Sequence, residues 1–349
     1  MKILYGVQGT GNGHISRARK MAAHFAARGA DVTWLFSGRE RQHLFDMENF
    51  GAFEHRRGLT MVQRRGAVLY WPTLRTTRAR RFLHDIRELD AAAFDLVVTD
   101  FEPVSAWAAR RAKVTCIGIG HQYAFAHDIP QCARTLISDL VMTWFAPADI
   151  GVGLHWHHFG ANVLPPIIDT ALRAGDRRHI LVYLPFEDQR TVTALLRRFD
   201  RYRFVQYAPD LIDAECGNVG LRRTNLHGFR ADLCNADAVI CNAGFELVSE
   251  CLHMGIAPLV KPVRGQMEQL SNALALQRLG WGQVLPELKE KALGAWLDGE
   301  RRAATLHYPD VAETLVDWLL RGDWHDTKAL RDTLWTRTGI APVRPLAEA

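Results

Sequence analysis

The sequence lacks the features that would place the chain in a membrane or build it around disulfides. It contains no run of about eighteen apolar residues, the length that a membrane-spanning helix needs. Its first residues, 1–6, have the pattern of a strand followed by glycine and not that of a signal peptide. The six cysteines are scattered without a Cys-x-x-Cys pair, which suggests free thiols in a reducing compartment. We therefore expect a cytoplasmic protein.

Two common nucleotide-binding motifs are missing as well. The dinucleotide-binding motif is Gly-x-Gly-x-x-Gly. When Gly9 and Gly11 are aligned with its first two glycines, the position of the last glycine is occupied by His14. The next apolar run ends Phe36-Ser37-Gly38, without the acidic residue that would bind a ribose. No Gly-Lys-Ser/Thr occurs either. The sequence thus argues against a dinucleotide site and against a P-loop.

What the chain does contain is an alternation of apolar strand-like runs and helical patterns. An apolar content of 48% and a length of 349 residues allow two soluble domains, each with its own core. Pro165-Pro166 interrupts the alternation, because paired prolines break helix and strand alike. We predict an α/β protein of two facing Rossmann-like domains, residues 1–164 and 165–322, with a C-terminal helix and tail at 323–349.

Periodicity and turn residues give the expected elements of the two domains. Strands are predicted at 2–7, 31–36, 95–99, 114–119, 150–156, 179–184, 203–207, 224–227, 238–241 and 258–262. Helices are predicted at 15–28, 131–146, from about 189 to 199, at 245–254, from the loop 264–269 through 272, and at 287–297, 312–320 and 327–336.

Titratable side chains follow several strands of the first domain. His14 lies in the glycine-rich turn after the first strand, Asp100 and Glu102 follow the strand at 95–99, and His121 follows the next. Because ligands bind outside the carboxyl ends of parallel strands, we expect these side chains to converge. They could take the proton from a substrate hydroxyl that acts as an acceptor. His14 is the first candidate for this base and Asp100 its rival, with Glu102 and His121 nearby. Each could instead be structural, since an acid after a strand often caps the next helix.

The stretch 226–273 predicts a pocket for a nucleotide sugar. The strand at 238–241 ends in Asn242-Ala243-Gly244, and a helix follows at once. Such a turn points unpaired backbone N–H groups and the positive end of a helix dipole at one place, where a diphosphate can bind. Glu250, about two turns into the helix, could accept hydrogen bonds from a ribose diol. Glu268 and Gln269 are an acceptor and an amide that could bind sugar hydroxyls.

This stretch resembles the donor half of the GT-B glycosyltransferases, in particular the MurG-like branch. The shared features, in order, are Asn242-Ala243-Gly244, Glu250, Gly255-Ile256-Ala257-Pro258 and Glu268-Gln269-Leu270-Ser271-Asn272-Ala273. The turn from Gly9 to His14 is similar to the Gly-x-Gly-Gly-His loop of the same enzymes, with Asn12 in place of a glycine. The whole chain also resembles uncharacterised bacterial and archaeal GT-B proteins of similar length.

The resemblance implies a glycosyltransferase that moves a sugar from a nucleotide-diphosphate donor, by default a UDP-sugar, to an acceptor hydroxyl with inversion. It also implies that the last helix returns to the first domain. The donor is a substrate and no cofactor is expected; because no Asp-x-Asp motif occurs, no metal is expected either. The residues expected to bind the nucleotide sugar are Gly11, Gly13, Phe229, Asn242, Ala243, Gly244, Phe245, Glu246, Glu250, Glu268 and Gln269, with Arg230 or Arg264 as further candidates for the diphosphate.

Charge is unevenly distributed in the sequence. Residues 55–84 contain no acidic side chain, and their arginines alternate with apolar and aromatic residues. Such a segment suits an acceptor that is lipid-linked or an anionic glycan, reached by peripheral contact at the inner membrane face. Solvated arginines around a buried hairpin are the alternative. No nucleic-acid-binding module accompanies the segment, so we expect no nucleic-acid partner.

Other interpretations of the sequence stay open. His155, His157 and His158 look like a metal cluster, but side chains this close on a strand point to opposite faces, so we predict no metal there. A UDP-N-acetylglucosamine 2-epimerase shares the fold and the nucleotide end of the pocket, although its additional catalytic carboxylates find no match. A noncatalytic sugar-nucleotide-binding protein would keep Glu250, Glu268 and Gln269.

Overall fold

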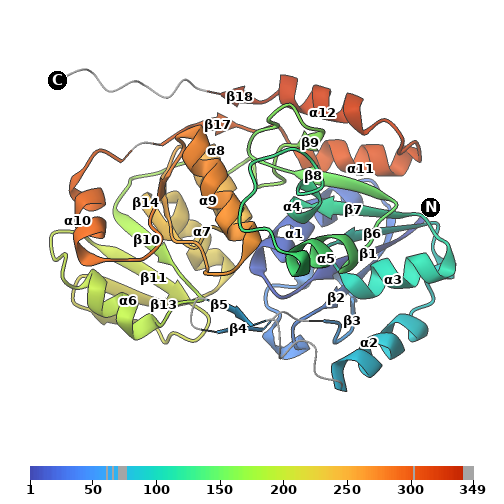
Figure 1. Cartoon of the computed structure of the whole chain (residues 1–349), viewed down its shortest axis with the longest axis horizontal. Coiled ribbons are helices and arrows are strands. Elements are labelled where there is room, and N and C mark those ends of the chain that lie inside the picture. Colours follow the sequence, from blue (N-terminus) through green and yellow to red (C-terminus); the bar gives the residue numbers. More distant parts are fainter. Residues whose placement is uncertain (60–61, 65–66, 70–76, 302, 341–349) are drawn as a thin grey trace.

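The structure, a computed structural model of the chain, describes residues 1–59, 62–64, 67–69, 77–301 and 303–340. Two α/β halves lie side by side, each with one large sheet and helices packed against it (Figure 1). The first half contains the N-terminal strands, and the second contains the strands that follow Pro165-Pro166. The predicted class, two Rossmann-like α/β domains, is confirmed.

The first sheet is parallel throughout, with the strand order β3-β2-β1-β6-β7-β8-β9. Its inner strands are short apolar runs because helices cover both of their faces, and β6 and β7 are completely buried. The bounds are β1 (Lys2–Gln8), β2 (Asp31–Ser37), β3 (Glu54–His55), β6 (Leu96–Asp100), β7 (Cys116–Gly120), β8 (Ile150–Leu154) and β9 (Val163–Leu164).

The second sheet has the order β12-β13-β11-β10-β14-β15-β16, with only the edge pair β12–β13 antiparallel. The bounds are β10 (His179–Tyr183), β11 (Phe204–Ala208), β12 (Ala214–Cys216), β13 (Val219–Arg223), β14 (Ala236–Cys241), β15 (Ala257–Val260) and β16 (Gln283–Val284). Two small antiparallel pairs complete the strands, namely β4 (Val62–Arg64) with β5 (Ala67–Leu69) and β17 (Leu306–His307) with β18 (Gly339–Ile340).

Helices connect the strands and cover the sheets. Those of the first domain are α1 (Asn12–Ala27), α2 (Thr77–Glu88), α3 (Pro103–Ala112), α4 (His121–Ala124) and α5 (Leu136–Trp144). The later ones are α6 (Gln189–Leu196), α7 (Leu226–Cys234), α8 (Phe245–Met254), α9 (Met267–Leu279), α10 (Glu290–Asp298), α11 (Val311–Arg321) and α12 (Thr327–Thr336).

The strand predicted at 224–227 is wrong, and the helix predicted at 131–146 is too long. Residues 226 onward form α7, because the Asn225 side chain accepts the N–H of Gly228 at 2.7 Å and caps a helix there. The strand lies just before it, as β13. The helix α5 begins only at Leu136, because Thr135 and Ser138 form a capping box at its start.

Two other boundaries bear on the site. Helix α1 begins at Asn12, so that His14 lies in its first turn and not in a loop before it. Strand β8 ends at Leu154, two residues earlier than predicted, and His155 to His158 follow in a turn.

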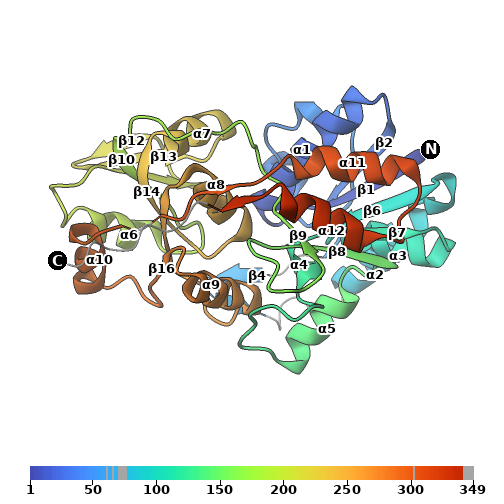
Figure 2. The same cartoon turned by 90° about the horizontal axis from the view of Figure 1, so that it is seen from above.

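The last helix, α12, returns to the first domain, as predicted, and α11 before it does so too (Figures 1 and 2). Helix α11 packs along α1, where His24 Nε2 lies 3.0 Å from Asp310 Oδ2. Helix α12 packs beside β9, and Trp335 Nε1 donates to the Val163 carbonyl oxygen at 2.7 Å. These contacts hold the end of the chain against the domain in which the chain began.

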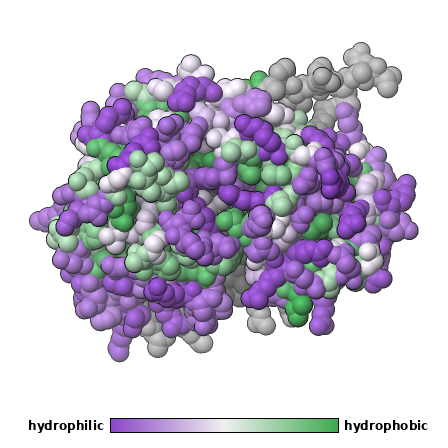
Figure 3. All heavy atoms as spheres, turned by 180° about the vertical axis from the view of Figure 1, so that it is seen from behind, coloured by the Kyte–Doolittle hydropathy of each residue, from purple (hydrophilic) through white to green (hydrophobic). Residues whose placement is uncertain are grey.

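Apolar packing also joins the two domains directly. The fully buried Trp156 ring stacks on Phe245 of α8 with centroids 5.5 Å apart, and its indole N–H donates to Ser249 Oγ at 2.9 Å. The face shown in Figure 3 is mostly hydrophilic, with apolar residues in small scattered patches. Within the described ranges, every helix is too short or too polar to cross a membrane.

Candidate active site

A cavity of about 270 Å³ lies between the domains, at the carboxyl ends of both sheets. We call it the main cavity. Its first-domain wall comes from the turn after β1, from α4 and from α5, and its second-domain wall comes from the turn after β14 and from the start of α9. A smaller cavity of about 110 Å³, the side cavity, shares Asn12, Gly13, Tyr183, Glu246 and Leu247 with it. The two cavities are therefore adjacent, on either side of these five residues.

His14 and Asp100 form a pair at the edge of the main cavity. His14 lines the cavity, and its Nδ1 lies 2.7 Å from Oδ1 of Asp100, the last residue of β6. Asp100 is fully buried behind it. Burial opposes the charge of Asp100, but Arg17 and His14 together hold its pKa below the usual value. An ionised Asp100 can only accept, so His14 donates its Nδ1–H, and in the neutral imidazole Nε2 is then the acceptor.

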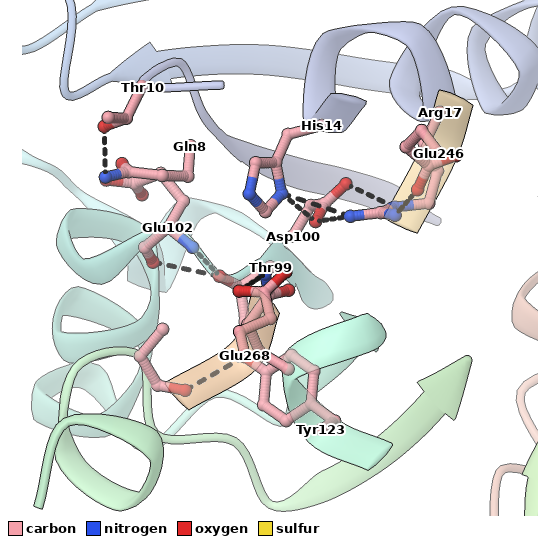
Figure 4. Close-up of polar contacts among 12 residues, drawn as sticks. Gln8, Thr10, His14, Arg17, Thr99, Asp100, Glu102, Tyr123, Glu246 and Glu268 are labelled. Carbon is pink, nitrogen blue, oxygen red and sulfur yellow. Dashed lines mark hydrogen bonds and ion pairs between the residues drawn. The ribbon is translucent and has the colours of Figure 1, made fainter. Parts of the chain in front are cut away.

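Sequence reasoning missed Arg17, which is central to the site. Its Nε and Nη2 donate to Oδ2 and Oδ1 of Asp100 at 2.8 and 2.6 Å, and its Nη1 pairs with Glu246 of α8 (Figure 4). The side chain is 2% exposed. A signal was present in the sequence, because Arg17 lies one turn after His14 among the apolar positions of an amphipathic helix.

The structure does not bring Glu102 to the cavity. Its carboxylate is fully buried and caps α3, accepting the N–H groups of Val104 at 2.8 Å and Ser105 at 2.6 Å. Ser37 Oγ donates to it as well, at 2.5 Å. Glu102 therefore takes the structural role that the sequence left open as an alternative.

His121 does line the main cavity, but its ring is fully engaged. It stacks on Phe245 with centroids 4.1 Å apart. Its Nδ1 lies 2.8 Å from the Leu154 carbonyl oxygen and its Nε2 lies 2.6 Å from Asn272 Oδ1. Burial lowers its pKa, and a neutral ring donates to only one of these two oxygens. Both ring nitrogens nevertheless lie against protein oxygens of α9 and β8, so neither is directed at a substrate.

The turn from β14 into α8 has the predicted form. Gly244 precedes the helix, and no side chain caps the first turn. Asn242 and Phe245 line the main cavity, whereas Ala243 is buried and its carbonyl oxygen accepts the Asn272 amide at 3.0 Å. Asn242 Oδ1 is buried without a hydrogen-bond partner among the described residues. The turn therefore offers backbone and amide groups to a polar ligand.

The glycine turn of the first domain meets this helix closely. Gly11 and Gly13 line the main cavity, and a Cβ on Gly13 would lie 2.7 Å from Cγ of Glu246. Burial raises the pKa of Glu246 to about 8; Arg17 opposes the shift, while Asp100, Glu250 and Glu268 add to it. Only a residue without a side chain fits at position 13 in this arrangement.

Glu250 lies in the side cavity together with Phe229 and Arg230. Burial raises its pKa to about 7, against the opposing charge of Arg230. Arg230 itself pairs with Asp169 at 3.2 Å. Arg264, the other arginine considered for the diphosphate, is exposed and lies outside both cavities.

Glu268 and Gln269 open α9 at the wall of the main cavity. Gln122 of α4 donates to Glu268 Oε2 at 3.0 Å, across the domain boundary. Gln269 Oε1 accepts the backbone N–H of Val263 at 2.9 Å, which fixes its orientation. The pair faces the cavity that contains His14.

The remaining histidine cluster does not form a metal site. His155 is buried and its ring packs against His121 and Phe159. In the part of the chain that the structure describes, no group of three or more His, Cys, Asp or Glu side chains is arranged to hold a metal ion. Most of the basic segment 55–84 lies outside the residues whose side chains are described; of those that are, Arg81 pairs with the buried Asp85 at 3.2 Å.

The profile of glycosyl transferase family 1 matches residues 1–299. The chain belongs to this family. No curated protein matches it. Among solved structures, SsfS6 of Streptomyces sp. SF2575 in complex with thymidine diphosphate is 14% identical, with a TM-score of 0.58 and 96% of each chain covered.

MurG of Acinetobacter baumannii is another similar structure, 13% identical, with a TM-score of 0.53 over 96% of this chain and 100% of that one. SnogD of Streptomyces nogalater is 16% identical, with a TM-score of 0.51 over 96% of each chain. At these identities the likeness concerns the fold. It confirms the predicted GT-B arrangement, and the family assignment identifies the chain as a glycosyltransferase.

Proposed function

We propose that the chain transfers a sugar from a nucleotide-diphosphate donor to an acceptor hydroxyl, with inversion at the anomeric carbon and without a metal ion. The observation that carries the proposal is the His14–Asp100 pair, which faces the same cavity as the start of α8. In a single displacement, the acceptor hydroxyl replaces the diphosphate at the anomeric carbon. This reaction requires a base on one wall of the cavity and an anion-binding helix start on the opposite wall.

In this mechanism His14 Nε2 accepts the proton of the acceptor hydroxyl while Asp100 holds the Nδ1–H. The hydroxyl oxygen forms a bond to the anomeric carbon, and the bond from that carbon to the diphosphate oxygen breaks with its electron pair. One in-line displacement of this kind inverts the anomeric centre. The backbone N–H groups and helix dipole at the start of α8 stabilise the charge that develops on the diphosphate.

The two cavities suggest where each part of the donor binds. The diphosphate lies at Gly244 to Glu246, the sugar faces Glu268 and Gln269, and the nucleoside occupies the side cavity beside Phe229. There Glu250 accepts hydrogen bonds from the ribose diol. UDP is the default nucleotide, as the MurG-like donor motif suggests, and the thymidine diphosphate found in the similar SsfS6 structure makes dTDP the first rival.

The side chains that line the main cavity indicate which kind of acceptor it could bind. Its α5 side is apolar, formed by Val141, Met142 and Phe145. On the outer side of α5, Leu136 is 84% and Leu140 60% exposed. A helix that lines the cavity on one side and exposes apolar side chains on the other supports a lipid-linked acceptor met at a membrane surface, with the basic segment 55–84 contributing to the contact or binding anionic groups of the acceptor.

A thermal-shift panel of UDP-, dTDP-, GDP- and ADP-sugars tests the donor site. We expect one nucleotide family to raise the melting temperature, and Glu250→Gln to remove that shift. Because the pKa of Glu250 is about 7 and that of Glu246 beside the diphosphate is about 8, raising the pH from 6 to 7 ionises mainly Glu250, so the shift should be larger at pH 7. Glu300→Gln is the control.

Analysis of the reaction products and of the effect of a metal chelator then distinguishes the remaining possibilities. A transferred sugar supports the proposal, an epimerised donor supports the 2-epimerase alternative, and binding without turnover supports a noncatalytic binding protein. Turnover that EDTA leaves unchanged supports the metal-independent mechanism, and turnover that EDTA abolishes and Mg²⁺ restores contradicts it.

A further inference from the structure

Arg17 connects the two domains at the point where His14 and Asp100 meet. From α1 its guanidinium uses one edge, Nε and Nη2, for both oxygens of Asp100, and its Nη1 for Glu246 of the second domain. Figure 4 shows His14, Asp100, Arg17 and Glu246 in one connected group. One buried positive charge thus serves a carboxylate from each domain.

The charge of Arg17 determines the protonation of Asp100. Asp100 has no exposed surface, and burial alone would favour its neutral acid. Arg17 and His14 reverse this preference, and Arg17 is the larger of the two influences that lower the pKa of Asp100. Three further titratable side chains, Tyr5, Tyr123 and His121, interact with the group, and burial favours the neutral form of each. Glu250 and Glu268 act on it through Glu246, whose pKa they raise.

The protonation of Asp100 in turn determines which nitrogen of His14 carries a proton. A neutral Asp100 would donate its proton to Nδ1, and the imidazole would then carry its own proton on Nε2. In that case the atom that faces the cavity could no longer accept a proton.

Glu246 holds Arg17 in the position that this function requires. Arg17 Nη2 lies 3.1 Å from His14 Nδ1 as well as 2.6 Å from Asp100 Oδ1. His14 Nδ1 and Arg17 Nη2 both donate to Asp100 Oδ1. Because Nδ1 carries a proton, it cannot accept a hydrogen bond from Nη2, so Nη2 donates to Asp100 and not to the imidazole. Glu246 accepts a hydrogen bond from Nη1 on the other side of the guanidinium, as a carboxylate above its pKa of about 8 and through its carbonyl oxygen below it, and so keeps Nε and Nη2 directed at Asp100.

We propose that Arg17 is a positioning residue for the transfer step, which keeps Asp100 ionised and His14 Nε2 free of a proton, and which Glu246 holds in place from the donor-side domain. The inference rests on the proposed role of His14 as the proton acceptor. Because Glu246 belongs to α8, its contact with Arg17 joins the two domains beside the base.

The test reads the proton on His14 directly and needs no substrate. Protein labelled with ¹⁵N-histidine gives long-range ¹H–¹⁵N spectra between about pH 6 and pH 9, and His14→Gln identifies the His14 signals. In the wild type we expect a protonated Nδ1 and an unprotonated Nε2 at the upper end of this range. Arg17→Gln, which removes the charge but can still hydrogen-bond, should move the Nε2 signal to its protonated position, and Arg17→Lys should restore the wild-type pattern.

The control is Arg28→Gln, which alters an arginine at the other end of the same helix and should leave the His14 signals unchanged. His14 signals in Arg17→Gln that match the wild type at every pH would overturn the inference. If Arg17→Gln does not fold, Arg17→Met is compared with Arg17→Lys in its place. A wild type with the expected spectrum but no turnover would count against the proposed function, whereas an active enzyme with unaltered spectra in Arg17→Gln would count against this inference alone.

Discussion

Single side chains of this protein bring together chemistry from distant parts of the sequence. His14 and Asp100 are 86 residues apart, and Arg17 and Glu246 are 229 apart. The sequence predicted that His14 and Asp100 would converge, because both follow parallel strands of one sheet. It could not predict the contact of Arg17 with Glu246, because that contact depends on how two domains face each other. For Glu102 the same reasoning failed. This residue also follows a parallel strand, but its side chain caps α3 and does not reach the cavity.

His14 gives the clearest prediction at the level of one residue. His14→Gln should lower the transfer rate by about 10²- to 10⁴-fold, the usual contribution of a positioned base. The donor-induced thermal shift should persist, because the substitution leaves the start of α8 intact. His24→Gln, on the same helix and paired with Asp310 far from the cavities, serves as the control. Comparable rates in His14→Gln and the wild type would exclude His14 as the base.

The elements around the site follow from local rules that the sequence displays. Buried strands were predicted from apolar runs, and α8, α9 and the final helix from turn residues and helical spacing. The errors fell on short segments such as 224–227, where apolar and β-branched residues suggested a strand but a single Asn side chain caps a helix. A few residues carry too little periodicity to decide between the two.

Two glycines on facing elements should respond differently to alanine. A Cβ at Gly244 meets nothing within 4 Å and its φ of −74° suits alanine, so Gly244→Ala should keep stability unchanged or raise it by about 0.4–1 kcal/mol. The same Cβ should obstruct the diphosphate and weaken the donor-induced shift. Gly13→Ala would collide with Glu246, and we expect it to lose about 1–3 kcal/mol of stability. Thermal denaturation with and without donor checks both, and equal responses of the two variants would contradict the account.

Across the whole molecule, the surface around α5 differs from the rest. Of the large hydrophobic side chains that are exposed among the described residues, Leu136, Ile137, Leu140 and Trp144 all lie on this one helix. Arg110 stacks over the Trp144 ring at 5.3 Å, so a positive charge accompanies the apolar side chains. Figure 2 shows α5 and α9, one from each domain, on the same side of the molecule. A membrane on this side would lie against two elements that contribute to the walls of the main cavity.

Liposome flotation tests this contact. We expect more protein to float with anionic than with neutral vesicles, and the double variant Leu136→Gln, Ile137→Gln to reduce flotation several-fold. Ile212→Gln is the matched control, because Ile212 is 83% exposed on the second domain. Equal flotation of all three proteins, or none with either lipid, would exclude a membrane role for α5 and leave the acceptor to be sought among soluble molecules.

The central claim is inverting transfer from a nucleotide sugar, and the anomeric form of the first product tests it most directly. The donor selected by the thermal-shift panel, as its α-linked nucleotide sugar, is incubated with the protein and followed by ¹H NMR before mutarotation. Water replaces the unknown acceptor. The account predicts release of the β-anomer, lost in His14→Gln. Release of the α-anomer, a donor epimerised at C2, or an unchanged donor that nevertheless binds would contradict it.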